Sequence, residues 1–197
     1  EIRVVDLLLP DLCGILRGKR VAVADLGAVY DPGLYLPGSM FALDVLGGTV
    51  QSTGLGFDEG DADRVCLPLA GTLVPVPWLG ADIAQMQVSM YEHDRTPFHG
   101  DPRHVLENVV ARFTALGLKP VMAVELEFYL VDRERTPAGH AQPPRQPLTG
   151  RREVKTQINS MQELNEYSAV LGAIAAAARD QELPVGTVLA EYGPGQF

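Results

Sequence analysis

The sequence predicts an α+β protein whose two halves differ in character. Residues 1–97 contain short alternating segments interrupted by proline and glycine, which is typical of a small and mostly β domain. Residues 98–197 instead alternate helix-like and strand-like segments. Hydrophobic residues make up 46% of the 197-residue chain, which is enough to form a core.

The first half is expected to begin with a β-hairpin. Residues 2–9 form an apolar run, residues 10–14 contain proline and glycine, and residues 15–24 are expected to be the returning strand. Residues 38–46 fit either a short helix or a strand. The five glycines between residues 46 and 60 indicate a long loop.

Three further strands are expected in the first half, at residues 65–68, 72–78 and 85–91. The first two contain prolines, which favours edge positions or strand ends because proline cannot donate a hydrogen bond to a neighbouring strand. The third alternates polar and apolar residues, which is typical of a half-buried strand.

The second half is expected to begin with a helix. Asp101 is the expected N-cap and Pro102 the first helical residue. Gly117 is expected to end the helix. Apolar residues at helical spacing predict one buried stripe, formed by Val105, Val109, Val110, Phe113 and Leu116.

A strand over residues 120–130 and a surface excursion over residues 133–152, rich in proline, glycine and arginine, are expected next. Ser160-Met-Gln-Glu163 has the pattern of a capping box and predicts a second helix. A last strand is expected over residues 186–192. The predicted apolar face of the second helix consists of Leu164, Tyr167, Leu171, Ile174 and Ala178.

Two acidic residues share one face of the strand expected at residues 120–130. Because strand side chains alternate, Glu125 and Glu127 project together, while the opposite face carries only apolar residues and is expected to be core. Glu191 lies in the last expected strand, directly before a Gly-Pro-Gly turn. Unpaired carboxylates are costly to bury, so the acidic face must meet water, a cation or a basic partner.

Two interpretations of these glutamates are open. An isolated pair of acids on an alternating strand is usually a solvated face. Carboxylates are also the ligands that Mg²⁺ and Mn²⁺ prefer. Alternate residues of a strand are separated by roughly 6.5–7 Å, which suits two carboxylates serving two neighbouring ions. The glycine turn after Glu191, and the lack of a nearby Lys or Arg on the same face, favour the metal interpretation.

Composition argues against several other classes of protein. The net charge is −9 and no basic stripe interleaved with aromatic residues is present, so nucleic acid is not expected as a partner. No apolar run reaches the roughly 20 residues that span a bilayer. Cys13 and Cys66 lack metal-ligand spacing and indicate a reducing, cytoplasmic location. The four histidines also lack such spacing and are expected at the surface.

Two motifs resemble those of the glutamine synthetase superfamily, closest to its γ-glutamylpolyamine synthetase (glutamate–putrescine ligase-like) branch. They are Glu125-Leu-Glu-Phe-Tyr-Leu130 and Glu191-Tyr-Gly-Pro-Gly-Gln-Phe197. The similarity runs in order along the chain and corresponds to the N-terminal portion of the family. Its supporting stretches are Leu16-Arg-Gly-Lys-Arg20, Leu36-Pro-Gly-Ser-Met-Phe-Ala-Leu-Asp44 and Phe98-His-Gly-Asp-Pro-Arg-His-Val-Leu106.

This resemblance implies a β-grasp domain over residues 1–97, followed by the first part of the catalytic domain over residues 98–197. It implies an ATP-dependent ligase that joins the γ-carboxyl of glutamate to an amine through a γ-glutamyl phosphate intermediate. Glu125 would bind the Mg²⁺ or Mn²⁺ ion nearer the nucleotide, and Glu127 and Glu191 the ion nearer glutamate. It also implies a homo-oligomer of stacked, dodecamer-like rings with shared active sites.

Two departures from the family pattern qualify these expectations. Ammonia-using members carry Asp-Gly-Ser-Ser where this chain has Ala42-Leu-Asp-Val45, which favours a larger amine over ammonia. The remaining metal, glutamate and nucleotide ligands of the family lie beyond Phe197, so no catalytic residue is assigned and this chain alone is expected to be inactive. The alternatives are an ammonia-using glutamine synthetase and a truncated, non-catalytic relative.

Overall fold

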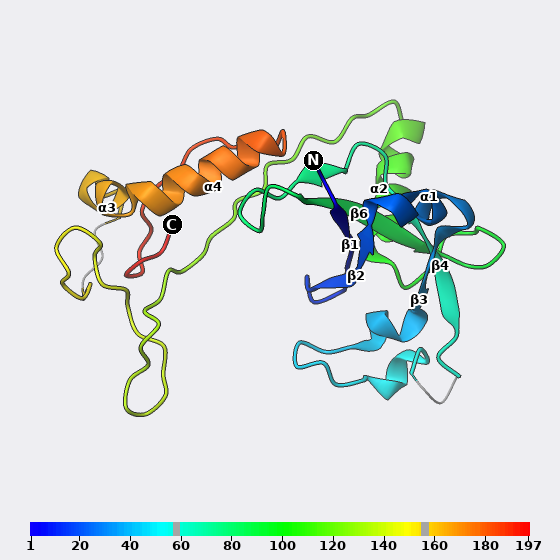
Figure 1. The fold of residues 1–197 in the computed structure, drawn as a ribbon, viewed down its shortest axis with the longest axis horizontal. Helices are drawn as coiled ribbons and strands as arrows, with labels where there is room; N and C mark the ends of the chain where they lie inside the picture. The colour runs from blue at the N-terminus through cyan, green and yellow to red at the C-terminus, as the bar shows by residue number, and fades with distance from the viewer. Residues whose placement is uncertain (57–59, 155–157) are drawn as a thin grey trace. The chain divides into compact units, whose positions relative to one another are not determined.

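The computed structural model describes residues 1–56, 60–154 and 158–197. These residues divide into two compact units, Glu1–Val121 and Met122–Phe197, which are described separately (Figure 1). The division lies after the helix α2 (Pro102–Ala115), whereas the domain boundary expected from the sequence lies before it, at residue 97. Within the described ranges, every helix is too short or too polar to cross a lipid bilayer.

The first unit is built on a mixed six-stranded sheet with few helices. Its strand order is β2-β1-β6-β4-β3, and β5 pairs with β6. Strands β1 and β6 are parallel, while the other pairs are antiparallel. The strands are β1 (Val4–Pro10), β2 (Leu16–Ala22), β3 (Leu34–Pro37), β4 (Asp63–Pro68), β5 (Val74–Pro75) and β6 (Ile83–Tyr91).

The core of this unit lies against the central strands β1 and β6. Every second residue of β1 is buried, namely Val5, Leu7 and Leu9, because successive side chains of a strand point to opposite faces. Met86, Val88 and Met90 of β6 extend the same core. It is completed by Val29, Leu36, Phe41, Cys66, Ala84 and Phe98.

Most of the expected elements of the first half are present. The hairpin of β1 and β2 is confirmed, with Val4 opposite Ala22 and Pro10 opposite Leu16. The strand expected at residues 72–78 shortens to β5, because few of its residues pair with β6. Residues 38–46 contain a helical turn, Gly38–Ala42. Other short turns are Val23–Asp25, α1 (Leu26–Ala28), Val29–Gly33 and Gln51–Thr53.

Helix α2 begins as the sequence predicts. The buried carboxylate of Asp101 accepts hydrogen bonds of 2.8 Å from the backbone N–H of Arg103 and from that of Met90 in β6. The expectation that all histidines lie at the surface is wrong for His104, which is buried. Its ring nitrogens lie 2.8 Å from the Met90 carbonyl and from the Glu107 carboxylate, so a partner distant in sequence accounts for its burial.

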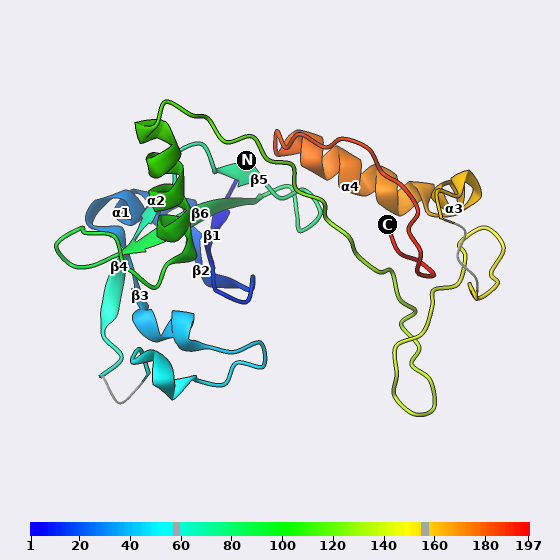
Figure 2. The same ribbon diagram turned by 180° about the vertical axis from the view of Figure 1, so that it is seen from behind.

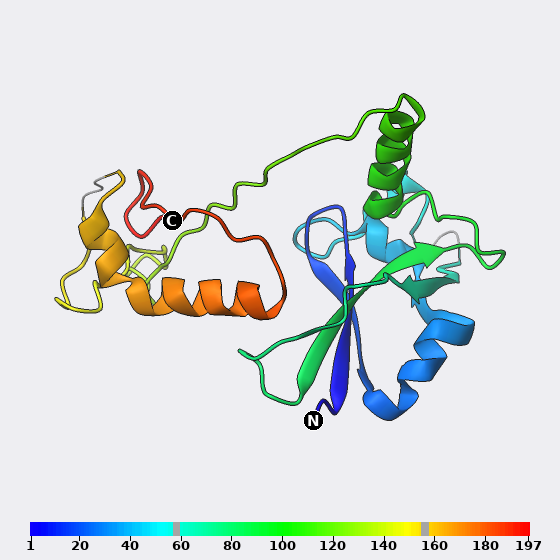
Figure 3. The ribbon, with the colours of Figure 1, turned by 90° about the horizontal axis from the view of Figure 1, so that it is seen from above.

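The apolar stripe of α2 is not buried in the first unit, contrary to the prediction. His104 is the one buried residue of this helix, and Leu116 at its end is 75% exposed. Figure 3 shows α2 extending away from the sheet. Contacts near the first turn hold the helix, and each residue of the stripe is at least 37% exposed. The exposed stripe consists of Val105, Val109, Val110, Phe113 and Leu116.

The second unit contains two consecutive helices, α3 (Met161–Glu166) and α4 (Ser168–Asp180). Ser160 caps α3 as expected, since its hydroxyl accepts a 3.3 Å hydrogen bond from the Glu163 backbone N–H. The single helix expected here is divided at Tyr167, whose side chain is buried with Ala190 and Phe197. The C-terminal segment therefore runs beside the two helices (Figure 2). Ile174 is an exception on the predicted apolar face, being 45% exposed.

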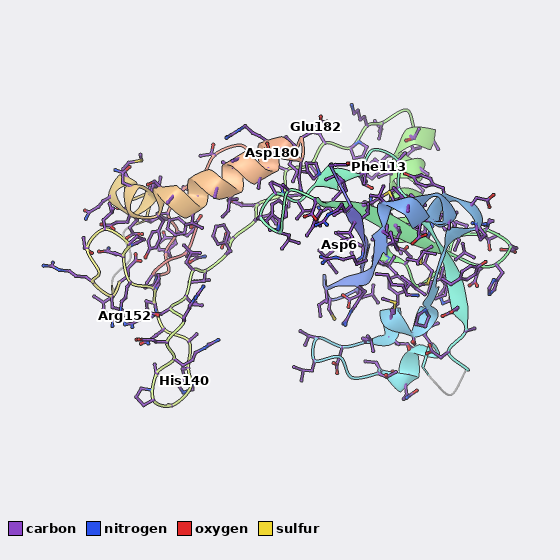
Figure 4. The ribbon with its side chains drawn as sticks, viewed as in Figure 1. Asp6, Phe113, His140, Arg152, Asp180 and Glu182 are labelled. Carbon is purple, nitrogen blue, oxygen red and sulfur yellow. The ribbon has the colours of Figure 1, made fainter. Side chains whose placement is uncertain are left out.

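The two strands expected in this unit are not formed over their predicted lengths. Residues 120–130 and 186–192 are extended or irregular, and the bridge that Tyr129 forms is with Gln196, beyond the second predicted strand. A strand needs a hydrogen-bonded neighbour, and no described segment pairs with residues 121–127. The predicted core face is consequently exposed at Val124 and Leu126, each 81% accessible, whereas Phe128 and Leu130 are partly buried against the cluster around Tyr167. The excursion over residues 133–152 is largely exposed as predicted, with His140 at its tip (Figure 4).

Candidate metal centre

The three glutamates singled out in the sequence come together in the second unit. Glu125, Glu127 and Glu191 each offer a carboxylate oxygen, and these oxygens all lie within 4.8 Å of one another. Glu125 and Glu127 are exposed, and Glu191 is half-buried. Among the described residues, no other group of three or more potential metal ligands is this close together.

A short antiparallel ladder brings the two acidic segments side by side. The Phe128 N–H donates to the Phe197 carbonyl at 2.9 Å, and the Phe197 N–H returns a bond of 3.0 Å to Phe128. The Leu130 N–H donates to Gly195 at 2.8 Å. These bonds fix the register between the two segments. The register in turn determines which side chain of the second segment lies beside Glu127.

The turn after Glu191 brings the chain back towards the first segment. The Glu191 N–H donates to the Gln196 carbonyl, and the Gln196 N–H donates to Gly193, each at 2.9 Å. Gly195 adopts a φ of +74°, and a Cβ at this position would lie 2.8 Å from the Leu130 carbonyl oxygen. Glycine is therefore required here, because it alone combines this backbone conformation with so close an approach.

The carboxylates border an open hollow of about 470 Å³. Its lining has no Lys, Arg or His, so no basic side chain there compensates the three negative charges. Clustered carboxylates without such a partner favour the binding of a cation, and oxygen donors suit a hard divalent ion. The lining residues are Ala123, Val124, Glu125, Leu126, Glu127, Phe128, Gly186, Thr187, Val188, Leu189, Glu191 and Phe197.

Packing behind the hollow supports its floor. The ring of Phe197 lies 5.1 Å from that of Tyr167 and 6.2 Å from that of Phe128, measured between centroids. The Tyr167 hydroxyl donates a 2.8 Å hydrogen bond to the buried carboxylate of Glu153. Burial and this carboxylate together raise the pKa of Tyr167, so its hydroxyl is retained as a donor.

Two residues beside the glutamates were not singled out from the sequence. Gln196 donates from its side-chain amide to Glu127 at 2.9 Å, and the Tyr129 hydroxyl donates to Gln196 at 2.8 Å. The sequence carried part of the signal, because Tyr129 shares the alternating face of Glu127. The contact of Gln196 joins residues 69 positions apart and could not be read from local pattern.

Comparison with known families identifies the family of this sequence. The model of the glutamine synthetase catalytic domain matches residues 99–197, which include all three glutamates. The chain belongs to the glutamine synthetase family. The resemblance seen in the sequence is thereby confirmed, and relatives in this family are ligases.

Among curated proteins, this glutamine synthetase family member is similar to γ-glutamylputrescine synthetase of Escherichia coli K12. The two are 43% identical over 193 residues, which cover 98% of this chain and 41% of the relative. Glutamate–isopropylamine ligase of a Pseudomonas species is 27% identical over 200 residues, covering 100% of this chain and 42% of that protein. The chain therefore spans about two fifths of the length of these relatives.

Solved structures show the same fold. A structure described as a novel glutamine synthase homolog matches with a TM-score of 0.74 at 21% identity, covering 100% of this chain and 42% of that one. A GmaS/ADP complex matches with a TM-score of 0.73 at 20% identity, covering 99% of this chain and 40% of that one. At these identities the likeness supports the family member's architecture and not its substrate.

Proposed function

We propose that the chain forms part of an ATP-dependent ligase that joins the γ-carboxyl of glutamate to an amine. The observation that carries this proposal is the cluster of Glu125, Glu127 and Glu191, whose oxygens lie within 4.8 Å of one another. The cluster occurs in a chain 43% identical to γ-glutamylputrescine synthetase. In the proposed reaction the glutamate γ-carboxyl is first phosphorylated by ATP, and the amine then displaces the phosphate.

The three glutamates would hold Mg²⁺ or Mn²⁺ in this reaction. Glu125 would hold the ion nearer the nucleotide, and Glu127 and Glu191 the ion nearer glutamate. Bound divalent ions neutralise charge on triphosphate and acyl phosphate oxygens. The oxygen-only donor set fits these ions, and the uncompensated negative charge of the hollow supports a cationic occupant.

A substrate amine larger than ammonia is supported by two observations. Two relatives that align with nearly the whole chain are named for putrescine and isopropylamine, whereas a glutamine synthetase of Pyrococcus horikoshii, at 30% identity, covers 66% of it. The loop that carries the Asp of ammonia-using members has Ala42 here, which is buried. The nearby Asp44 accepts hydrogen bonds of 2.8 Å from the N–H groups of Leu46 and Gly48, so its carboxylate stabilises its own loop.

The proposed domain organisation follows from the family. Residues 1–97 would form a β-grasp domain and residues 98–197 the first part of the catalytic domain. The family match beginning at residue 99 supports this boundary, even though α2 clusters with the first unit in the structure. The proposed assembly is a homo-oligomer of stacked, dodecamer-like rings.

The reaction is tested by measuring phosphate release with glutamate, ATP and Mg²⁺. The protein that contains this chain is assayed with putrescine, a longer polyamine, isopropylamine and ammonia, and the γ-glutamyl product is identified by mass spectrometry. We expect turnover with an amine and loss of turnover in Glu125→Gln. Turnover with ammonia alone would refute the amine assignment. No turnover with any nucleophile would refute the ligase assignment and favour a non-catalytic relative.

A further inference from the structure

We infer that Gln196 and Tyr129 are positioning residues that hold the Glu127 carboxylate ready for a cation. This inference rests on the proposed metal site and adds two residues to it, neither of which is a metal ligand. Glu127 Oε2 accepts a hydrogen bond of 2.9 Å from Gln196 Nε2. Gln196 Oε1 accepts two hydrogen bonds of 2.8 Å, from the Tyr129 hydroxyl and from the Gly193 backbone N–H.

These contacts determine which way the Gln196 amide faces. A backbone N–H can only donate, so the group beside Gly193 must be the amide oxygen. The amide nitrogen then necessarily faces Glu127, where it meets an acceptor. The Tyr129 hydroxyl is compatible with this orientation, because it donates to the same amide oxygen.

The amide is well suited to holding a metal-binding carboxylate. It occupies Glu127 Oε2 and leaves the other oxygen free for an ion. Because the amide is neutral, it orients the carboxylate without cancelling its charge, whereas a lysine or arginine in this place would compete with a cation. Groups that orient metal ligands through hydrogen bonds contribute substantially to affinity.

Gln196 also connects Glu127 with Glu191. Its backbone carbonyl accepts from the Glu191 N–H at 2.9 Å while its side chain holds Glu127. One residue therefore contacts both the carboxylate of Glu127 and the backbone of Glu191. Gly193 makes the arrangement possible, because a Cβ there would overlap the ring of Tyr129. Closure of the turn therefore also brings the Gln196 side chain into contact with Glu127.

Tyr129 acts on Glu127 through Gln196. Its ring is 57% exposed, and its hydroxyl donates to the Gln196 amide oxygen. Removing this hydroxyl should therefore matter only while Gln196 is present. Such dependence between two substitutions distinguishes a connected chain of hydrogen bonds from two separate contributions.

The test measures Mn²⁺ binding to the protein that contains this chain by electron paramagnetic resonance of the free ion, with circular dichroism to verify folding. We expect Gln196→Met to weaken binding about tenfold and Tyr129→Phe about threefold. The double variant should bind as Gln196→Met does. Tyr192→Phe is the matched control, because it removes a hydroxyl from an exposed tyrosine of the same turn. Its affinity should equal that of the unsubstituted chain.

The outcomes separate this inference from the proposed function. Equal Mn²⁺ affinity in all folded variants would overturn the positioning role while leaving the metal centre intact. Independent losses that multiply in the double variant would overturn the connection through Gln196. If the unsubstituted protein that contains this chain is folded and binds no Mn²⁺, the metal centre itself is refuted and the positioning role with it. Should Gln196→Met fail to fold, comparison of Tyr129→Phe with Tyr192→Phe still decides whether Tyr129 contributes.

Discussion

The Tyr167 hydroxyl donates a hydrogen bond of 2.8 Å to the carboxylate of Glu153, and both residues are at least 96% buried. The ring of Tyr167 packs edge-on against Phe197, which pairs through its backbone with Phe128. Phe128 directly follows Glu127 in the chain. This buried interaction joins the junction of α3 and α4 to Glu153, which directly follows the 133–152 excursion. It thus supports the segment that carries the candidate metal ligands.

Removing this hydroxyl should destabilise the second unit. Tyr167→Phe leaves a buried Glu153 oxygen without its donor, which costs about 1–3 kcal/mol. We expect the free energy of unfolding in urea to fall by that amount, while Tyr192→Phe changes it by less than about 0.5 kcal/mol. Equal stability of the two variants would show that the Tyr167 hydroxyl contributes nothing.

Substitutions in the glutamate cluster should affect stability differently in the absence and in the presence of metal. Without metal, Glu125→Gln, Glu127→Gln and Glu191→Gln should each leave stability unchanged or slightly increased, because charge repulsion is relieved. Excess Mn²⁺ should raise the thermal midpoint of the unsubstituted chain by mass action and raise that of the variants less.

Glu182→Gln provides the control for this experiment. Glu182 is exposed just beyond the end of α4 (Figure 4), and it belongs neither to the glutamate cluster nor to the lining of the hollow. Its variant should retain the full response to Mn²⁺. An equal response in all four variants would contradict the metal centre.

The cap of α2 should be a major stabilising contact of the first unit. Asp101 is 1% exposed and accepts from the N–H groups of Arg103 and Met90. Asp101→Ala removes a helix cap and leaves the buried Met90 N–H unpaired, which together should cost about 2–4 kcal/mol. Chemical denaturation measures this loss. The exposed Asp25, replaced by alanine, should change stability by less than about 0.5 kcal/mol.

Stability of the first unit should fall in acid because of Asp11. Burial opposes ionisation of Asp11, but hydrogen bonds from the Ile15 and Cys13 N–H groups and from Arg17 outweigh it and lower its pKa below 3.8. A carboxylate whose pKa is lower in the folded state stabilises the fold at any pH above its unfolded-state pKa. This stabilisation is lost as the pH falls through the folded-state pKa. Asp11→Asn should therefore be less stable at pH 7 and lose less stability between about pH 5 and pH 2. An unchanged acid profile in the variant would contradict this role.

The two cysteines should differ in reactivity. Burial raises the pKa of Cys66 to about 12, and its side chain lies in the core, whereas Cys13 is exposed. Thiolate is the reactive form, so at pH 8 a thiol reagent should modify one cysteine rapidly in the native protein and both after denaturation. Peptide mapping should find the fast label on Cys13. Fast labelling of Cys66 would show that the core opens readily.

Elements specified by neighbouring residues were predictable from the sequence. The hairpin of β1 and β2, the cap at Asp101 and the cap at Ser160 were all confirmed, because each depends on residues within one turn or one reversal of the chain. Alternation also correctly placed the carboxylates of Glu125 and Glu127 close together. The strands at residues 120–130 and 186–192 were predicted wrongly, since alternation identifies a chain able to form a strand but not a neighbour for it to pair with.

The sequence by itself determined the family, the candidate metal ligands and most of the local elements. Motifs, caps and hairpins depend on residues that are close together in the chain. Only the tertiary structure decided that His104 is buried, that the stripe of α2 is exposed, and that Gln196 holds Glu127. These relationships join residues distant in the chain. They depend on which surfaces meet after folding, and no local pattern specifies that.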